Sequence, residues 1–420
     1  METEYEDMEG KLLSFSMSLA ETPPPAGLIL RSPSYPLAAA PLEAPITHDQ
    51  LTSLLLAAAA AADPDNPAPS SDAVDALAQL YRHVSPRGDD PFRRVAAYFA
   101  DALAAAMTSA CLPCSLEQEF AAFTQFYRAS PFFQFGHFTA NQTIVEAFEA
   151  EESRNGGKLH VIDFDVSYGF QWPSLLQSLS DKATPDSPVS LHLTGFGRTA
   201  AELEETRLRL VSFAHGCPNL AFAFTGLVRG STASDLMIDD GATLVVNLAF
   251  YLRTRQSPAE LRATLAAVRA LSPSVTVVVD RETGRPAGGF VGRFVENLSY
   301  FAAMFESLHD CLPAESAERV SIERDQLGKE MQRAVQGGDW EWRGKIASAG
   351  FEEAELSSRS VSQARLLLKM KGHASSMEHV GNGGFGIEES RDGNSIALCW
   401  RRRRLVSVSA WRLRPRAAAR

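Results

Sequence analysis

The spacing of apolar and polar residues divides the chain into a helical first part and an alternating second part. From Thr47 to about residue 150, apolar residues recur every three or four positions, as in amphipathic helices. The clearest helix follows Asp90, which can cap it, and Pro91, which suits a first turn. Residues 46–150 are therefore predicted to form a helical unit. The apolar face of that clearest helix holds Val95, Tyr98, Phe99, Ala102, Leu103, Ala106 and Met107.

Capping residues predict three further helix starts. Ser115 with Gln118, and Thr139 with Gln142, have the spacing of a capping box, in which two residues satisfy each other's backbone N–H groups. Ser257 stands at the same distance before an acidic residue. We therefore expect a helix to begin just after each of these three hydroxyl residues.

Beyond Gly156 and Gly157 the pattern changes to short β-branched runs that alternate with helical stretches. Helices between strands are typical of βαβ units and a parallel sheet. This order predicts an α/β fold in which residues 151–412 form a Rossmann-like, doubly wound sheet. The predicted strands are 158–162, 189–193, 220–224, 243–248 and 275–279.

The end of the chain predicts antiparallel strands at the edge of that sheet. Runs at 387–390 and 395–400 flank Arg391-Asp392-Gly393-Asn394, a hairpin signal, and 405–410 can add another strand. Four tryptophans are expected between the late helices and these strands, where each indole N–H needs a partner. They are Trp340, Trp342, Trp400 and Trp411.

Composition narrows the classes of protein. The chain has 420 residues, 45% of them hydrophobic, and only 5 Cys, which excludes a disulfide scaffold. Residues 1–45 hold 7 of the 23 Pro and are predicted to be a disordered leader. The longest apolar run, 54–62, is less than half of the roughly 20 residues that a membrane span needs, and the acidic start does not resemble a signal peptide. We expect a soluble protein in a reducing compartment.

Positive charge is concentrated at the carboxyl terminus. The net charge is −11, yet eight of the 40 basic residues lie within 401–420, where there is no acid. The acidic body excludes non-specific coating of DNA, so any DNA contact must be local. The candidates are Arg401, Arg402, Arg403 and Arg404, followed by a basic tail at 413–420; the alternative is a strand edge blunted by charge.

Metal and redox chemistry have little support in the sequence. Cys111 and Cys114 have the spacing of half a zinc site or a redox pair, but the sequence holds no second cysteine pair. His160 lies inside a predicted strand, and we expect it to pack against a neighbouring helix rather than to act in catalysis. No metal site is predicted.

The loop after the first strand decides whether the sheet can hold a nucleotide-type cofactor, because open parallel sheets bind ligands at the carboxyl ends of their strands. Residues 163–169 contain one Gly, where cofactor loops have two or three, and the second strand continues into residues 193–195 with no acid to hold a ribose. The candidates for a ligand pocket, one that would bind a nucleotide-type cofactor only weakly, are Asp163, Asp165, Tyr168 and Gly169. The alternative is that the two acids cap a helix or pair with a basic residue.

Several motifs resemble, in order, those of the GRAS family of plant transcriptional regulators. Leu159, His160, Val161, Ile162 and Asp163 resemble its signature strand, with Leu159 and Val161 where Val and Ile are commoner. The match spans roughly 47–412, and an Arg-rich tail runs past the usual end. Residues 163–180 resemble a scarecrow-like branch that includes symbiosis-related regulators. The other matching blocks are 137–142, 293–294 with 296–300, 323–330, 356–357, 361–364, Trp400 and 409–412.

This resemblance implies a helical cap over a core similar to class I methyltransferases, acting without a cofactor or a membrane as a nuclear regulator. The implied partners are other GRAS proteins or transcription factors, in homo- or heterodimers, with DNA bound directly or through a partner. The cap is expected to pair through leucine-rich helices, and residues 51–55 have an LxxLL pattern that fits a partner's groove. The alternative for these leucines is an ordinary buried face. They are Leu51, Leu54, Leu55, Leu77, Leu80 and Leu103.

Two other functions stay open at this point. One is an S-adenosylmethionine-dependent methyltransferase that acts at the loop 163–169. The other is a direct, sequence-specific DNA-binding protein that uses a local basic groove at 401–404.

Overall fold

The structure is a computed structural model of the chain. The predicted leader, the pair Cys111 and Cys114, Trp340 and the last five residues of the basic tail lie outside the residues that it describes. No helix in the described part is long and apolar enough to cross a membrane. The described residues are 46–63, 71–108, 115–231, 236–255, 257–282, 288–337, 342–372 and 384–415.

The first part of the chain is helical, as predicted. Asp90 caps α4, since its carboxylate accepts from the backbone N–H of Phe92 at 2.9 Å. Ser115 and Gln118 form the predicted capping box of α5, and Ser257 caps a later helix, α10. The helices of this part are α2 (His48–Ala61), α3 (Ser71–Tyr81), α4 (Pro91–Thr108), α5 (Leu116–Ala129) and α6 (Pro131–Ala150).

The predicted helix start at Thr139 is wrong, because Thr139 lies in the middle of α6. This helix begins at Pro131, and the hydroxyl of Ser130 accepts from the N–H of Phe132. The carbonyl of Thr139 accepts from the hydroxyl of Thr143, one turn further along the helix. A capping box acts only where the chain before it leaves the helix, and that condition cannot be read from the spacing alone.

Among the described residues, nine strands form one sheet. Its order is β3-β2-β1-β4-β5-β9-β8-β7, so the chain builds outward from β1 on one side and then returns to the other side of β1 with β4. The predicted doubly wound, Rossmann-like fold is confirmed, and the order reverses between β1 and β4. The parallel strands are β1 (Lys158–Asp163), β2 (Val189–Gly197), β3 (Leu220–Val228), β4 (Thr243–Ala249) and β5 (Val275–Arg281).

The carboxyl-terminal strands are antiparallel, as predicted. β7 (Phe385–Glu389) and β8 (Ser395–Trp400) form the hairpin, and β9 (Arg403–Leu413) pairs with both β8 and β5. The sequence pattern missed β6 (Phe351–Ala354), which pairs with the end of β9. Half of this strand is acidic, so no apolar run marks it.

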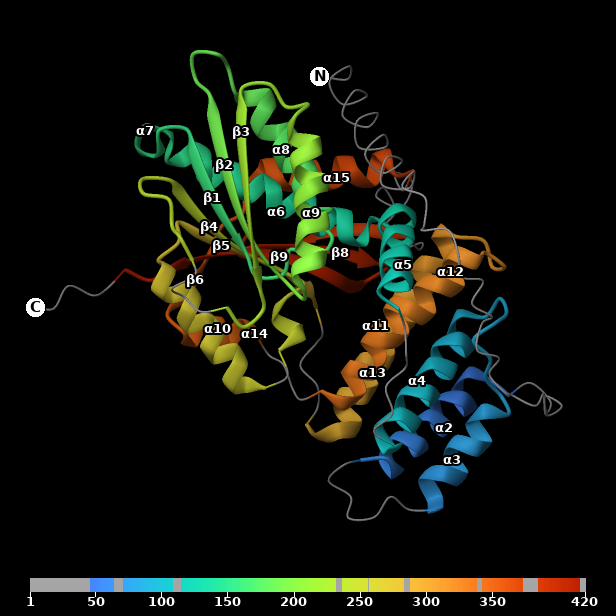
Figure 1. Cartoon of the computed structure of the whole chain (residues 1–420). Coiled ribbons are helices and arrows are strands. Elements are labelled where there is room, and N and C mark those ends of the chain that lie inside the picture. The colour runs from blue at the N-terminus through green and yellow to red at the C-terminus, as the bar shows by residue number, and fades with distance from the viewer. Residues whose placement is uncertain are drawn as a thin grey trace, which may run out of the picture.

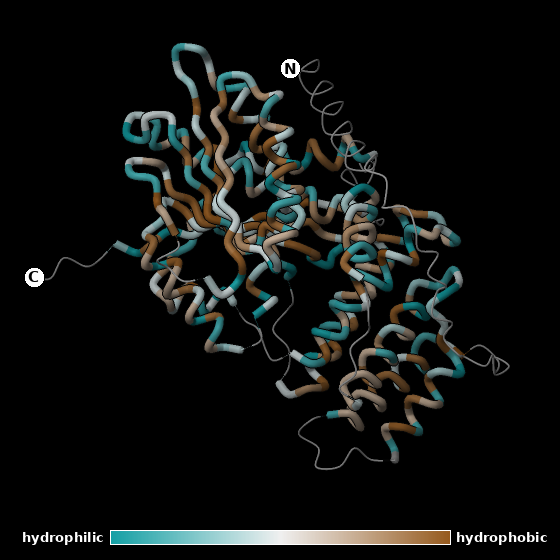
Figure 2. Tube along the Cα trace, viewed as in Figure 1, coloured by the Kyte–Doolittle hydropathy of each residue, from teal (hydrophilic) through white to brown (hydrophobic). Residues whose placement is uncertain are grey.

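Helices cover both faces of the sheet (Figure 1). Residues of α6, α8 and α9 pack with Leu159 and Val161 on one face, and residues of α10 and α14 pack with Ile162 on the other. The apolar segments in Figure 2 follow the central strands, which are buried on both sides and therefore read as continuous apolar runs. The later helical elements are α7 (Glu152–Asn155), α8 (Trp172–Lys182), α9 (Ala200–Ala214), η2 (Leu252–Thr254), α10 (Pro258–Leu271), α11 (Gly289–Cys311), α12 (Ala317–Ile322), η3 (Glu323–Gly328), α13 (Lys329–Gln336), α14 (Trp342–Ser348) and α15 (Ser358–Met370).

The helical part is completed by segments from far along the chain. Helix α4 packs against α11 and α13. Arg94 of α4 has no exposed surface, and its Nε lies 3.0 Å from Oε1 of Glu323, which is equally buried. Arg319 approaches the same carboxylate at 3.1 Å. Two guanidinium groups therefore neutralise one buried carboxylate between early and late helices.

Helix α6 lies directly on the sheet, in contact with β4, β5 and β9. Gly136 permits this approach, because a Cβ at that position would lie 2.7 Å from Cγ1 of Val279 on β5. By its packing, α6 thus belongs with the sheet, although it lies within the predicted helical unit 46–150. In contrast, α2, α3 and α4 pack together at the other end of the molecule (Figure 1).

Three of the four tryptophans lie where they were predicted, between the late helices and the terminal strands. Trp342 and Trp411 share one buried cluster, in which the indole N–H of Trp411 donates to the hydroxyl of Ser409 at 2.9 Å. The indole N–H of Trp400 donates to the carboxylate of Glu306 on α11 at 3.2 Å.

Candidate functional site

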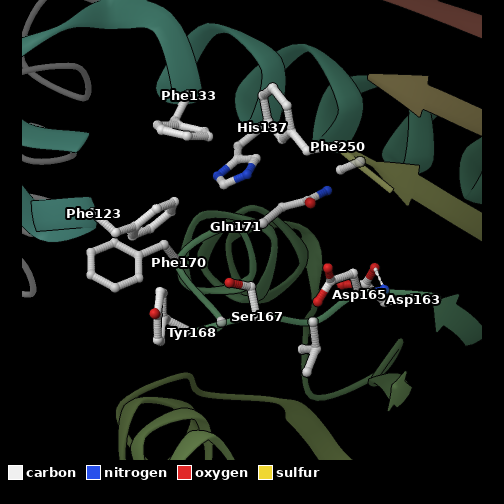
Figure 3. Close-up of a pocket in the computed structure, with 13 residues that line it drawn as sticks. Phe123, Phe133, His137, Asp163, Asp165, Ser167, Tyr168, Phe170, Gln171 and Phe250 are labelled. Carbon is white, nitrogen blue, oxygen red and sulfur yellow. Dashed lines mark hydrogen bonds between the residues drawn. The ribbon is translucent and has the colours of Figure 1, made fainter. Parts of the chain in front are cut away.

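The loop after β1 stands at the carboxyl end of the sheet, where β1 leads into α8 (Figure 3). Asp163 ends β1 and is buried, and its carboxylate accepts from the side-chain N–H of Asn247 and from the backbone N–H of Asp165, both at 3.2 Å. Burial, and to a smaller degree the charge of Asp165, raise the pKa of Asp163 to about 7. Asn247 also donates to Gln171 at 3.0 Å, so a buried polar network supports the loop.

The loop is tied to the neighbouring strands. The N–H of Val166 donates to the carbonyl of Phe196 on β2 at 2.9 Å. Gly195 leaves room for this contact, since a Cβ there would lie 2.8 Å from the Cβ of Val166. Asp165 forms an ion pair with Arg229, which follows β3. Asp165 thus pairs with a basic residue, which was one of the two alternatives for it.

Tyr168 and Gly169 complete the loop by packing against helices. The ring of Tyr168 lies edge-on to Phe120 of α5, with centroids 4.9 Å apart, and its hydroxyl accepts from Arg198 at 3.3 Å. Gly169 has φ of +76°, and a Cβ there would lie 2.9 Å from Cγ2 of Thr206 on α9. This glycine therefore serves the turn and the helix contact, not the approach of a ligand.

These residues do not fit S-adenosylmethionine. A dinucleotide-type or nucleoside cofactor needs free backbone in a glycine-rich loop and an acid at the end of the second strand. Here the loop backbone at Val166 is bonded to β2, and β2 is followed by Arg198, whose guanidinium is held by Glu119 and Glu202. Both places where the sequence predicts weak cofactor binding are therefore taken by contacts within the chain, a backbone hydrogen bond at Val166 and side-chain ion pairs at Arg198.

A cavity nevertheless lies beside the loop, between the sheet edge and the late helices. Its outer part has a volume of about 680 Å³, and a narrower inner part has about 90 Å³. The inner part contains His137 of α6, whose ring points into it near Phe133 and Phe250 (Figure 3). The sequence did not single out His137 as a site residue, because nothing within the apolar helix α6 marks which residues face a cavity.

Comparison with known proteins decides the family. The model of the GRAS domain family matches residues 51–412. The chain belongs to the GRAS domain family. It is 33% identical over 388 residues to Protein SCARECROW of Ipomoea nil, which covers 87% of this chain and 46% of that protein. It is also 33% identical over 362 residues to Scarecrow-like protein 23 of Arabidopsis thaliana. That match covers 81% of this chain and 84% of that protein.

A solved GRAS structure has the same fold. The crystal structure of SCL7 in Oryza sativa shares 30% sequence identity and a TM-score of 0.70, covering 86% of this chain and 99% of that one. DELLA protein GAIP of Cucurbita maxima is 33% identical over 343 residues, covering 76% of this chain and 56% of that protein, so pairwise identity does not separate a scarecrow-like branch from DELLA relatives. The chain spans about half the length of the first curated relatives it matches.

In this GRAS domain the predicted partner-binding leucines are mostly core residues. Leu51, Leu55, Leu80 and Leu103 have no exposed surface and Leu77 is also buried, whereas Leu54 is partly buried. They lie on α2, α3 and α4, which pack together, and α2 also contacts α11. Two of the LxxLL leucines, Leu51 and Leu55, therefore lie in a buried amphipathic face that a partner cannot reach unless the helical part opens, and Leu54 is only partly covered.

The basic run of the GRAS domain is largely neutralised within the chain. Three of its four arginines form ion pairs with acids, and among the described residues Arg402 has no ion pair. The run therefore matches the alternative of a charged strand end better than an open DNA-binding groove. The pairs are Arg401 with Glu306, Arg403 with Glu296, and Arg404 with Glu282 and Glu388.

The signature-strand residue His160 does not pack against a helix as expected. Its ring stacks on His192 of β2, with centroids 4.2 Å apart and planes at 14°. The described part of the connection between β3 and β4 contains no helix, and the N–H of Asp239 in that connection donates to Nδ1 of His160 at 3.3 Å. Burial lowers the pKa of His160 to about 4, which keeps this acceptor neutral.

The same cluster has the residue types of a metal site, but its geometry serves hydrogen bonds. The carboxylate of Asp239 lies 3.1 Å from Nδ1 of His192, and the two Nε2 atoms contact Thr194 and Thr225 at 2.9 Å. Every ring nitrogen therefore has a partner, and stacked imidazoles direct their in-plane lone pairs parallel to each other, not toward one ion. The cluster fixes the connection over the sheet.

Proposed function

We propose that this chain is a nuclear transcriptional regulator that acts through assembly with other proteins. Its place in the GRAS domain family, among SCARECROW, Scarecrow-like and DELLA relatives, supports this function. The methyltransferase-like core serves as a scaffold and not as a catalyst. The observation that carries this proposal is the sealed loop after β1, in which Val166 is bonded to β2 and Asp165 is paired with Arg229.

The partner surface that we infer is the outer face of α2 and α3. These helices lie at the end of the molecule farthest from the sheet, where a partner can approach them (Figure 1). Val74 on α3 is 58% exposed, and Ala57, Ala60 and Ala78 are exposed beside the partly buried Leu54. Small residues on a helix face allow another helix to approach closely, so a helical partner surface fits this face.

DNA is reached through a partner in this proposal. The acidic body of the chain and the ion pairs of Arg401, Arg403 and Arg404 leave little free positive charge at the basic run. Counterion release from phosphates, which drives DNA affinity, needs cations that are not already neutralised.

Light scattering of the purified chain after size exclusion tests the partner surface. We expect a dimer for the parent chain, and a monomer for Val74→Asp. Leu208→Asp is the matched control, because Leu208 is 54% exposed on α9, away from the proposed surface, and it should leave the dimer intact. If the parent is monomeric, the same pair of variants is tested for binding to purified Scarecrow-like protein 23. Equal binding by both variants would exclude this surface.

A tethered reporter assay in plant protoplasts tests regulation. The chain is fused to an unrelated DNA-binding domain and compared with that domain alone, and we expect the reporter output to change. Val74→Asp should reduce the change and Leu208→Asp should not. An unchanged reporter, or exclusion of a fluorescent fusion from the nucleus, would contradict the proposal.

Isothermal titration with S-adenosylmethionine tests the scaffold against the methyltransferase. We expect no measurable binding to the parent chain. Micromolar binding that is abolished by Gly169→Trp would instead favour the enzyme.

A further inference from the structure

The cavity beside the loop has the size of a small-molecule site. Its outer part, of about 680 Å³, falls within the range of roughly 300 to 1,000 Å³ that is common for ligand pockets. The inner part, of about 90 Å³, continues from it, because Phe123, Phe133 and Phe250 line both. A molecule in this cavity would place an apolar body among these rings.

An unpartnered polar atom lies at the inner end. His137 is only 7% exposed, and its buried Nδ1 has no hydrogen-bond partner among the described residues. Aromatic rings surround His137: the centroid of its ring lies 5.6 Å from that of Tyr127 and 5.9 Å from that of Phe250. Burial lowers the pKa of His137 to about 3, so the imidazole is neutral at physiological pH. Buried polar atoms in folded proteins are normally paired, and the ring that carries this one points into the inner part of the cavity.

The outer wall carries two cations that no acid neutralises. The four acids that line the outer cavity already form ion pairs with other basic residues. Glu119 pairs with Arg198 and Lys329, and Asp165 pairs with Arg229. The other two are equally engaged, Glu202 with Arg198 and Asp325 with Arg324.

By contrast, Arg255 lies 4.3 Å from the ring centroid of Tyr251 and donates to the hydroxyl of Thr254, and Arg333 is exposed on α13. Neither has a carboxylate partner within the described part of the chain. Both residues line the outer cavity, so its wall has an excess of positive charge.

We propose that this cavity binds a small organic anion, a carboxylate or a phosphate ester, with an aromatic or alicyclic body. Its anionic group pairs with Arg255 and Arg333, because guanidinium groups match planar carboxylate and phosphate oxygens. Its apolar body packs against Phe133 and Phe250, and a polar group at its other end satisfies His137. S-adenosylmethionine does not fit this description, since its sulfonium and ammonium groups would face a cationic wall.

Three probes of similar shape test the proposal on the full chain. They are 2-naphthoic acid, 2-naphthyl phosphate and the neutral 2-naphthalenemethanol, titrated by calorimetry. We expect saturable binding of at least one anion, about tenfold or more tighter than that of the neutral alcohol. The comparison of the two anions shows whether a carboxylate or a phosphate is preferred. Failure of both anions to bind below about 1 mM, or equal affinity for the alcohol, would overturn the proposal.

Variants locate the site. The double variant Arg255→Gln and Arg333→Gln alters exposed or partly exposed side chains and should fold like the parent, as checked by circular dichroism. It should weaken the better anion by about tenfold or more and leave the alcohol unchanged. Arg402→Gln, which removes a cation far from the cavity in the chain, should change neither. Unchanged anion affinity in the double variant would refute this site.

The result is independent of the proposed assembly function. Loss of probe binding in the double variant leaves the outer face of α2 and α3 untouched, and Val74→Asp leaves the cavity untouched. The two proposals can therefore fail separately.

Discussion

Asp163 and Asn247 stand opposite each other at the ends of β1 and β4, the two strands between which the sheet order reverses. The amide N–H of Asn247 donates to the carboxylate of Asp163 at 3.2 Å, and both side chains are buried. In sheets of this topology the reversal point is where a ligand usually sits. Here a hydrogen bond within the chain joins the two strand ends, beside the inner part of the cavity that Asp163 lines.

Asp163→Asn should change the pH dependence of stability. Because burial raises the folded-state pKa of Asp163 to about 7 from its ordinary 3.8, the folded chain holds this proton more tightly than the unfolded chain. The resulting stability is complete below about pH 4 and is lost as the pH rises through 7. Between pH 6 and pH 8 the parent should lose roughly 1 kcal/mol relative to the variant in urea denaturation. Asp186→Asn, in an exposed turn, is the control, and parallel pH profiles for parent and Asp163→Asn would contradict the prediction.

Glu323→Gln should destabilise the junction between early and late helices. The substitution leaves the two buried guanidinium groups of Arg94 and Arg319 without a counter-charge. Removing one partner from a buried ion pair costs about 3 to 5 kcal/mol. Thermal and urea unfolding measure the loss, with the exposed Glu318→Gln on neighbouring α12 as a control that should melt like the parent. A normal melting curve for Glu323→Gln would mean that the carboxylate is not needed in its charged form.

Trp411→Ala should destabilise the packing of β9 against α10 and α14. The indole is 3% exposed and packs with Trp342 and residues of α10 in one cluster. Truncation of a buried aromatic residue costs about 3 to 5 kcal/mol. Leu208→Ala, at a position that is 54% exposed, should change the free energy of unfolding by less than about 0.5 kcal/mol. Equal denaturation midpoints for the two variants would place Trp411 outside the core.

Gly136→Ala tests the close approach of α6 to the sheet. In an exposed helix this change is stabilising, but here the new Cβ would lie 2.7 Å from Val279 and must push α6 away from β5. Overpacking of this kind costs about 1 to 3 kcal/mol. Gly386→Ala is the matched control, because no atom lies within 4 Å of its new Cβ. Stabilisation by Gly136→Ala would show that α6 has room to move.

The sequence predicts most of the strands and helix starts because these depend on neighbouring residues. Ser115 and Gln118 act as a cap from their local spacing, and the parallel strands are apolar runs bounded by turns. Thr139 has the same local signal and fails, because its chain is already inside a helix that Ser130 begins. Local spacing indicates a cap but does not say whether a stronger start precedes it.

The candidate sites are harder to predict, because their chemistry depends on pairs that are distant in sequence. Arg401 to Arg404 form a basic run in the sequence, yet the acids that pair with them come from α11, β7 and the end of β5. The leucines of α2 are predicted from an amphipathic pattern, but only the fold shows that α3, α4 and α11 cover them. His137 belongs to one of the blocks that resemble the GRAS family, but nothing in the sequence marks it as a cavity residue until α6 is placed beside the loop.

The junction of Arg94 with Glu323 has a consequence for synthesis of the chain. The two residues are 229 positions apart, so α4 leaves the ribosome long before the late helices that pack on it, α11 and α13, exist. Phe99, which packs on Phe294 and Phe301 of α11, stays available to chaperones while the parallel strands are translated. A product truncated before α11 would leave this ring uncovered permanently, and quality-control proteases should recognise it.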